Sequence, residues 1–399
     1  MLQLDQAVAL LRDSVPAATE TERVPLWEAL GRVLGEDCVA RQDQPPFPRS
    51  PLDGYAVRGA DTAGATPSNP VRLRVIGKIF AGESFSGTVG PGEAVRIMTG
   101  APIPTGADTV LRQEDTDLNT QEVLLYRSSF PYENYCPAGE FYHSGDLLLK
   151  KGTHLNAVAL SLLAGTGRDS VAVYQHPPVA VISTGDEVLE PGIPSAPGKI
   201  YDSNRYFLTA RLTELGCPPV ESLHCGDDAE ALARQIRRLS RGCQLIVTTG
   251  GVSVGEKDIL HQTLDLLGAK RLFWKVAVKP GSPTLAAVYE NTLLICLSGT
   301  PSGAEAHFEL LVRPVMEKLT GSARWTLRRT RARLMDRFPK GSKLCRYLRG
   351  ILEGEQVTLV KPEAEDGVLS GQVRSNCYVQ LPPRSAGFEA GEEVWVYCL

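Results

Sequence analysis

The glycine-rich segment 248–258 has the residue types best suited to binding phosphate. It reads Thr-Thr-Gly-Gly-Val-Ser-Val-Gly-Glu-Lys-Asp and follows the apolar run 245–247, which has the length and branching of a buried parallel strand. Its glycines would let backbone N–H groups approach an anion, and the apolar spacing of 259–267 predicts a helix whose N-terminus also favours negative charge. The candidate phosphate-binding residues are Gly250, Gly251, Ser253 and Gly255.

Carboxylates stand at the edge of this candidate anion site. Glu256 and Asp258 end the segment, which makes chemical sense if a hard cation such as Mg²⁺ lies between protein and phosphate. The plain alternative is a strand-to-helix turn with solvated acids, because single glycine-rich loops match many unrelated turns.

A second segment of the same kind makes a chance match less plausible. The apolar run 179–182 leads directly into Ser183, Thr184, Gly185, Asp186 and Glu187. Two strands that each end in Thr-Gly and acids would place both loops at the carboxyl edge of one parallel sheet, where open α/β folds bind ligands. Asp227, with Glu230 three residues later, predicts a capping box, and Asp227 and Asp228 could serve only as a helix cap.

Three further groups could contribute to a ligand site. Asp53 lies beside a glycine and a tyrosine after a proline-rich linker, and Thr99 ends a predicted strand before Gly100; simple turns are the alternative for both. Lys275 and Lys279 alternate, so they are expected to share one face of a strand over 275–281. They could neutralise a polyanion or be solvated lysines on an exposed edge.

Elements of several kinds must position these residues. The chain is predicted to be multidomain α/β plus β, since helical spacing, branched strands and glycine turns occupy different stretches. Proline at 45, 46 and 48 marks a linker after the first forty residues. Helices are expected at 4–15, 24–34, 155–164 and 206–215; strands are expected at 71–76, 94–98, 109–111, 357–359, 378–381 and 394–397.

Composition excludes some classes of protein. Of the 399 residues, 43% are apolar, which is enough for several hydrophobic cores. The net charge of -4 argues against a broad surface that binds nucleic acid. Nine scattered cysteines include no Cys-x-x-Cys pair, so neither a zinc ribbon nor a disulfide framework is indicated. Neither a signal segment nor a membrane span of about 18 apolar residues is expected, and the expected compartment is the cytoplasm.

Taken together and in order, these motifs resemble the MoeA family of molybdopterin molybdenumtransferases. The likeness covers nearly the whole chain. The Gly-Gly-Val-Ser-Val-Gly loop alone is also similar to loops of MogA-like adenylyltransferases and CinA-like proteins, so the larger set is what points to MoeA. That set comprises Arg49-Ser50, 53–56, 96–102, 183–187, 248–258 and 275–281.

The resemblance implies an architecture and an activity. It implies an elongated homodimer whose active cleft lies between the MogA-like domain of one protomer and the β-domain of the other. The domains would be a discontinuous helical domain (1–42 and 136–170), an inserted β-domain (43–135), a MogA-like doubly wound α/β domain (171–321) and a C-terminal β-barrel (322–399). The activity would be insertion of molybdate into adenylylated molybdopterin with Mg²⁺-dependent release of AMP, and a MogA-like adenylyltransferase would be a partner.

The resemblance also implies roles for individual residues. The residues expected to hold Mg²⁺ are Asp186, Glu187, Asp227 and Asp258. Those expected to bind substrate are Thr99, Ser183, Thr184, Gly185, Gly250, Gly251, Ser253 and Gly255. The expected catalytic residues are Asp53, Glu187, Asp227, Asp258, Lys275 and Lys279, with Asp53 and Thr99 reaching in from the partner subunit.

The sequence also departs from the family pattern. Residues 279–283 read Lys-Pro-Gly-Ser-Pro where the family has Lys-Pro-Gly-Lys-Pro. The positively charged lysine side chain of the family is therefore missing at Ser282. Residues 298–303 read Ser-Gly-Thr-Pro-Ser-Gly in place of Pro-Gly-Asn-Pro-Val-Ser. The substituted loop thus includes Ser298 and Thr300. The other substituted positions are Leu52, Cys136, Phe141, Ala286 and Ala287.

Two function classes therefore remain open. The first is a transferase that uses molybdate or tungstate, and the second is a binding protein of the same fold that holds a pterin, nucleotide or oxyanion without turnover. The retained carboxylates favour the enzyme, because a scaffold has no reason to gather repelling acids where no metal binds. A CinA-like nucleotide-processing role is disfavoured by the match across 49–102.

Overall fold

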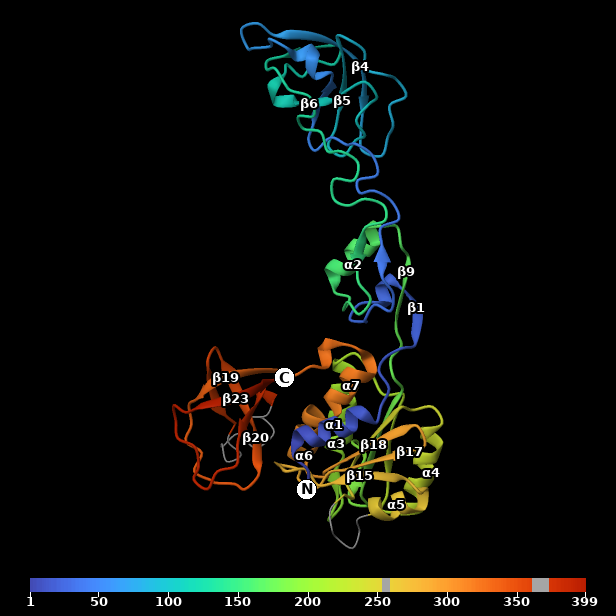
Figure 1. Cartoon of the computed structure of the whole chain (residues 1–399), viewed down its shortest axis with the longest axis vertical. Coiled ribbons are helices and arrows are strands. Elements are labelled where there is room, and N and C mark those ends of the chain that lie inside the picture. Colours follow the sequence, from blue (N-terminus) through green and yellow to red (C-terminus); the bar gives the residue numbers. More distant parts are fainter. Residues whose placement is uncertain (253–258, 361–372) are drawn as a thin grey trace. The chain divides into compact units, whose positions relative to one another are not determined.

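The computed structural model describes residues 1–252, 259–360 and 373–399 (Figure 1). By its contacts the chain separates into two units: residues 1–36, 152–160 and 169–399 form the first, and residues 37–151 and 161–168 form the second. The four domain boundaries expected from the sequence remain predictions.

The first unit is built on a six-stranded sheet. The first four strands in spatial order are mutually parallel, and the fifth is antiparallel to both of its neighbours, the fourth and the sixth. In that order the strands are β13 (Glu221–Cys225), β10 (Val179–Thr184), β14 (Leu245–Thr249), β18 (Thr292–Leu297), β17 (Leu285–Tyr289) and β15 (Lys270–Trp274).

Helices cover both faces of this sheet (Figure 1). On one face are α1 (Leu4–Asp13), α3 (Ser203–Glu214), α6 (Pro301–His307) and α7 (Arg313–Thr320), with the short η4 (Phe308–Val312) between the last two; on the other are α4 (Ala229–Ser240) and α5 (Ile259–Leu267). Val181 packs into the first layer and its neighbour Ile182 into the second. Since both faces are buried, β10 reads as a continuous apolar run. The predicted doubly wound α/β domain is confirmed.

A closed five-stranded barrel follows, as predicted. Each strand pairs with two neighbours in the ring, and β20 closes it by pairing with β22. The barrel strands are β19 (Arg328–Leu334), β20 (Cys345–Glu353), β21 (Gln356–Leu359), β22 (Cys377–Leu381) and β23 (Glu393–Cys398). The two-residue strand β16 (Val278–Lys279) pairs in parallel with β20 and so joins the barrel to the α/β domain.

A buried ion network stabilises the helices beside the sheet. Glu309 in η4 accepts hydrogen bonds from Arg211 Nε at 2.7 Å and Arg313 Nη1 at 2.8 Å. Arg313 also donates from Nε to the Trp325 carbonyl at 3.0 Å. Because the side chains of Arg313 and Glu309 are only 5% and 1% exposed, each charge depends on the other for compensation.

Shorter elements complete the first unit. They are β1 (Thr21–Pro25), η1 (Leu26–Glu28), β9 (Ser170–Tyr174), β11 (Val188–Leu189), β12 (Ile200–Tyr201) and η5 (Ala323–Trp325); α2 (Ala157–Gly165) spans the sequence boundary between the units. The expected helix over 24–34 is wrong, because Val24 lies in β1, which pairs antiparallel with β9. Tertiary pairing here overrides a helical spacing of apolar residues.

The second unit has a five-stranded sheet of its own. In spatial order its strands are β6 (Thr109–Arg112), β3 (Gly54–Val57), β5 (Glu93–Ile97), β4 (Val71–Ile79) and β7 (Glu122–Leu125); β2 (Cys38–Val39), β8 (Leu147–Leu149), η2 (Gly59–Thr62) and η3 (Gln113–Asp115) complete it. Gly54 is required in β3, since a Cβ there would lie 2.0 Å from the Leu111 carbonyl oxygen. The strands expected at 71–76, 94–98 and 109–111 are confirmed.

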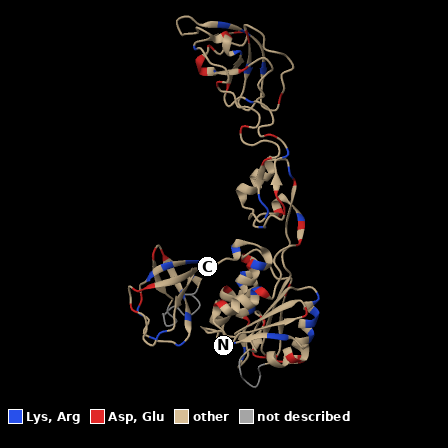
Figure 2. Ribbon diagram, viewed as in Figure 1, with Lys and Arg blue, Asp and Glu red and all other residues tan. Residues whose placement is uncertain are grey.

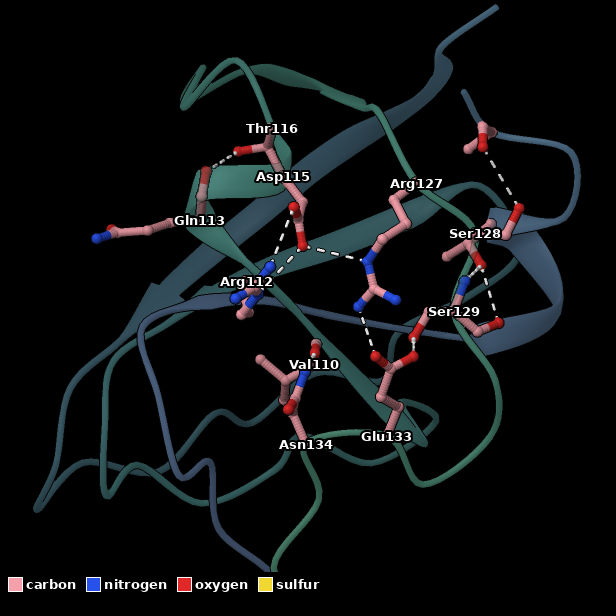
Figure 3. A network of polar contacts seen from close by, with 12 residues as sticks. Val110, Arg112, Gln113, Asp115, Thr116, Arg127, Ser128, Ser129, Glu133 and Asn134 are labelled. Carbon is pink, nitrogen blue, oxygen red and sulfur yellow. Dashed lines mark hydrogen bonds and ion pairs between the residues drawn. The ribbon is translucent and has the colours of Figure 1, made fainter. Parts of the chain in front are cut away.

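A polar network fixes the loop that follows β7 in the second unit (Figure 3). Arg127 lies between two acids: its Nε donates to Asp115 Oδ2 at 3.2 Å, and its Nη2 donates to Glu133. Ser129 Oγ donates to the same Glu133 carboxylate at 2.7 Å. These charge-assisted bonds hold the loop against η3, although the bonded loop residues belong to no helix or strand.

Acidic and basic residues occur on the elements of both units (Figure 2). The described part of the chain contains no helix with the length and apolar character that crossing a membrane requires.

Candidate active site

A cavity of ≈ 1180 Å³ lies in the first unit at the carboxyl ends of β10 and β14. It is bounded on one side by turns of the α/β domain and on the other by the barrel. The residues that line it include Ser183, Thr184, Gly185, Glu187, Asn204, Asp227, Gly250, Gly251, Lys279, Ser282, Ser298, Gly299, Thr300, Glu305, Arg337, Phe338, Lys340, Arg346, Arg349 and Tyr378.

The two glycine turns predicted from the sequence lie side by side. Because β10 and β14 are parallel neighbours, with Ser183 opposite Thr249, the turns that follow them meet at one sheet edge. Gly250 has φ +99°, and a Cβ on it would lie 2.6 Å from the Thr184 carbonyl oxygen. Only glycine fits there, so the close approach of the turns requires this residue.

The acids after β10 and β13 are also brought together. Asp186 Oδ1 accepts from the Asp227 N–H at 3.0 Å, and Asp227 Oδ2 accepts from the Asp186 N–H at 3.3 Å. Glu187 and Asp227 both line the cavity. The expected capping role of Asp227 is wrong, because the neighbouring Asp228 caps α4 by accepting from the N–H groups of Glu230 and Ala231.

Some of the residues expected to bind Mg²⁺ or phosphate lie outside the part of the chain that the structure describes. Asp258, Ser253 and Gly255 lie outside the described residues, as does Glu256. Within the described ranges, no group of three or more His, Cys, Asp or Glu side chains is placed to hold a metal ion. Asp186, Glu187 and Asp227 nevertheless offer the hard oxygen donors that Mg²⁺ takes.

The two lysines are in different surroundings. Lys279 lines the cavity, whereas Lys275 is not among the lining residues and its Nζ lies 4.0 Å from the Trp274 ring centroid. The single strand expected over 275–281 is wrong. Lys275 has φ +73°, and the Val278 N–H donates to the Val276 carbonyl at 2.8 Å, so a tight turn interrupts the alternation.

Asp53 and Thr99 lie in the second unit and contact each other. Asp53 Oδ1 accepts from the Thr99 N–H at 2.8 Å and from its hydroxyl at 2.7 Å. These two bonds, the side-chain one first, lower the pKa of Asp53. The carboxylate is therefore held charged and oriented at the edge of β3.

The positions that depart from the family pattern have local roles. Ser282 Oγ donates to the Val276 carbonyl at 3.0 Å. Ser298 and Thr300 hold their hydroxyls 3.0 Å apart in the turn after β18. Phe141 is 61% exposed, and the Arg49 guanidinium carbon lies 5.6 Å from its ring centroid.

Several residues of the site were not predicted from the sequence. Asn204 Nδ2 donates to Thr249 Oγ1 at 2.9 Å and to the Gly299 carbonyl at 2.8 Å, so it connects the turns after β14 and β18. The barrel wall, including Arg346 and Arg349, was missed as well. The Asp202 cap of α3 was a usable local signal for Asn204; the barrel residues gave none.

His307 is fully buried next to Gly281, a residue that lines the cavity, and we expect it to make the stability of the protein depend on pH. Its Nδ1 contacts Thr284 Oγ1, and burial lowers its pKa to about 4 from 6.5. Below pH 6.5 this imidazole is protonated in the unfolded chain but stays neutral in the folded protein. The free energy of unfolding should therefore fall by about 3 kcal/mol as the pH falls from about 6.5 to about 4.

Urea unfolding at a series of pH values would measure this loss, with His307→Gln as the comparison. The variant should show a shallower decline across the same interval. Some decline would remain, since burial also lowers the pKa of His176 to about 4. Equal slopes for the wild type and the variant would contradict the prediction.

Family models match most of the chain. A model of the MoeA N-terminal region (domain I and II) matches residues 2–167, a probable molybdopterin binding domain matches 180–318, and the MoeA C-terminal region (domain IV) matches 331–399. The molybdopterin molybdenumtransferase of Bacillus subtilis strain 168 is 37% identical over 390 residues, covering 94% of this chain and 89% of that relative. This chain belongs to the MoeA family.

Further relatives agree with MoeA membership. The molybdopterin molybdenumtransferase of Staphylococcus aureus strain COL is 36% identical over 393 residues, or 98% of this chain and 93% of the relative. Two solved MoeA structures from Pyrococcus horikoshii superpose with TM-scores of 0.85 and 0.81 at 32% and 31% identity; both cover 100% of this chain, and 99% and 100% of their own. As a MoeA-family member the chain is a transferase, and its place is in molybdenum cofactor biosynthesis.

Proposed function

We propose that this MoeA-family chain inserts molybdate into adenylylated molybdopterin and releases AMP in a Mg²⁺-dependent reaction. The observation that supports this most is that two glycine turns and the carboxylates Glu187 and Asp227 line one cavity. Adenylylated molybdopterin contains a diphosphate bridge. Backbone N–H groups suit its phosphate oxygens, and carboxylates suit a cation shared with them.

The residues of this cavity would bind and orient the substrate. Gly250 and Gly251 would present backbone donors to phosphate, and Lys279 would balance its negative charge. Asn204 would keep the turn after β14 in place through its bond to Thr249. A covalent nucleophile on the protein is not required for this reaction.

The carboxylates would hold Mg²⁺. Asp186 and Asp227 each use one oxygen on the other's backbone N–H, which orients both groups and leaves the second oxygen of each without a hydrogen bond to a described residue. Glu187 and Asp258 would add further oxygen ligands. When bound, Mg²⁺ would supply positive charge that stabilises the departing phosphate.

The proposal also includes protein partners. A homodimer would allow Asp53 and Thr99 of one copy to complete the site of the other, and the two hydrogen bonds between them would hold the Asp53 carboxylate ready for that role. A MogA-like adenylyltransferase would supply the adenylylated substrate.

In vitro turnover tests the proposed function. Purified protein is supplied with adenylylated molybdopterin, Mg²⁺ and either molybdate or tungstate, and AMP is followed by chromatography. We expect AMP release that requires both the oxyanion and Mg²⁺. Binding of the nucleotide-linked pterin without AMP release would contradict the proposal and favour a non-catalytic binding protein, and release with tungstate alone would change the oxyanion assigned to it.

A further inference from the structure

Two cysteines of the barrel lie opposite each other on neighbouring antiparallel strands. In the register of β22 with β23, the partner of Cys377 is Cys398. The N–H of the next residue, Leu399, donates to the Asn376 carbonyl at 2.9 Å. A ladder bond just outside the pair is typical of a non-hydrogen-bonded pair, in which the Cα atoms lie about 4.5 Å apart and the side chains approach most closely.

Both cysteines belong to the inward-facing row of their strand. Cys377 lies in the barrel core with Val379, and Val394 and Val396 of β23 lie in the same core. Because side chains alternate between the two faces of a strand, Cys398 shares the face of Val394 and Val396. The two thiols are therefore on the same side of the sheet.

This placement meets the distance requirement of a disulfide. Cysteines joined by a disulfide have Cα atoms about 4.4 to 6.8 Å apart. Directly opposed residues of an antiparallel pair are about 4.5 or 5.5 Å apart, depending on the hydrogen-bond pattern, so both values fall in this range. Cys377 and Cys398 are free thiols in the structure, and the strands would keep their register if the bond formed.

The two thiols differ in access and in reactivity. Cys377 is fully buried, and burial raises the pKa of its thiol to about 12, so this thiol by itself should react slowly with an oxidant. Cys398 is partly exposed at the end of β23. A small oxidant from solvent would therefore meet Cys398 first.

We propose that Cys398 and Cys377 form a peroxide-sensitive pair that is converted into an intramolecular disulfide. In the first step, the Cys398 sulfur takes one oxygen of hydrogen peroxide, which gives a sulfenic acid and one water. In the second step, the Cys377 sulfur displaces the hydroxyl from this sulfenic acid. The S–S bond forms, the S–O bond breaks, and the proton of Cys377 leaves with the hydroxyl as a second water. The thiols are oxidised and the peroxide is reduced.

The disulfide would fasten β23 to β22 at one end of the barrel. Because a disulfide restricts the unfolded chain, the oxidised protein should melt at a higher temperature than the reduced protein. Reaction with Cys377 would also protect the Cys398 sulfenic acid from further oxidation. The pair is separate from the proposed reaction, since neither cysteine is among the described residues that line the cavity.

Peroxide treatment of the full chain followed by thiol counting tests the pair. After a low dose of hydrogen peroxide, titration in denaturant should find two thiols fewer than the nine of the reduced chain, and dithiothreitol should restore them. Peptide mass spectrometry without reduction should find Cys377 linked to Cys398. Loss of thiols without this linked peptide would overturn the proposal.

Two serine variants show whether the loss is specific. Cys398→Ser should lose no thiols under the same treatment, and its melting temperature should not change. Cys345→Ser is the matched control, because Cys345 is also a partly exposed cysteine of a barrel strand. Its register partner is Val278, and its Sγ accepts from Gln380 Nε2 at 3.6 Å, so this variant should still lose two thiols. Equal losses in the two variants would overturn the pairing.

A third variant tests the order of the two steps. Cys377→Ala leaves Cys398 without a thiol to react with, so the sulfenic acid should accumulate and be captured by dimedone at Cys398. The wild type should form much less of this adduct, because Cys377 consumes the sulfenic acid. Equal amounts of adduct in the wild type and in Cys377→Ala would show that Cys377 does not react with Cys398, and the proposal would fail.

Discussion

Asp227→Asn should lower the rate of AMP release about a hundredfold or more. The amide oxygen can still accept the Asp186 N–H that the carboxylate now accepts, so the turn is expected to keep its shape. What is lost is the negative charge at a half-buried position that lines the cavity. Turnover assays at saturating substrate would measure the fall, with circular dichroism to check that the protein is folded.

Asp228→Asn is the control for the same loop. Asp228 caps α4, asparagine caps helices about as well, and the residue is not among those lining the cavity. Turnover in this variant should stay within about twofold of the wild type, because the removed charge is solvated. A direct readout is calorimetric binding of Mg²⁺ with pyrophosphate present, which should weaken only in Asp227→Asn. Equal losses in both variants would contradict a specific role for Asp227.

Glu309→Leu should destabilise the first unit by about 3–5 kcal/mol, because it leaves Arg313 buried without a counter-charge. Arg211 would lose its inner partner as well. Urea unfolding monitored by tryptophan fluorescence would measure the change, since Trp325 is buried beside Arg313.

Glu214→Ala provides the comparison for this substitution. Glu214 also contacts Arg211, at 2.8 Å, but its side chain is 66% exposed. An exposed pair of this kind contributes at most about 1 kcal/mol. Similar losses in the two variants would show that burial is not what makes the Glu309 network stabilising.

Local sequence patterns were sufficient for the α/β core and its turns. The branched runs 179–182 and 245–247 were predicted as buried strands, and both extend to the Thr-Gly positions that close the cavity. Turn glycines could be recognised because a residue such as Gly250 has a positive φ, +99°, which is a local backbone conformation that favours glycine. These features depend on a few neighbouring residues, so periodicity and turn chemistry reveal them.

Some local patterns were misleading. The apolar spacing of 24–34 is typical of a helix. Nevertheless, β1 at the start of this segment pairs with β9, which lies far along the chain. Lys275 and Lys279 have the alternation of one strand, but the positive φ of Lys275 turns the chain between them. Propensity and alternation describe what a segment prefers alone, and long-range pairing can outweigh that preference.

The sequence by itself determined that two βα turns carrying glycines and acids lie at one edge of a parallel sheet. Only the tertiary structure decided what faces them. The wall opposite is set by the pairing of Lys279 in β16 with Arg346 in β20, and by the contact of Arg349 with Glu305. Register between strands so distant in sequence follows from how the barrel closes and packs, and no pattern within either segment specifies it.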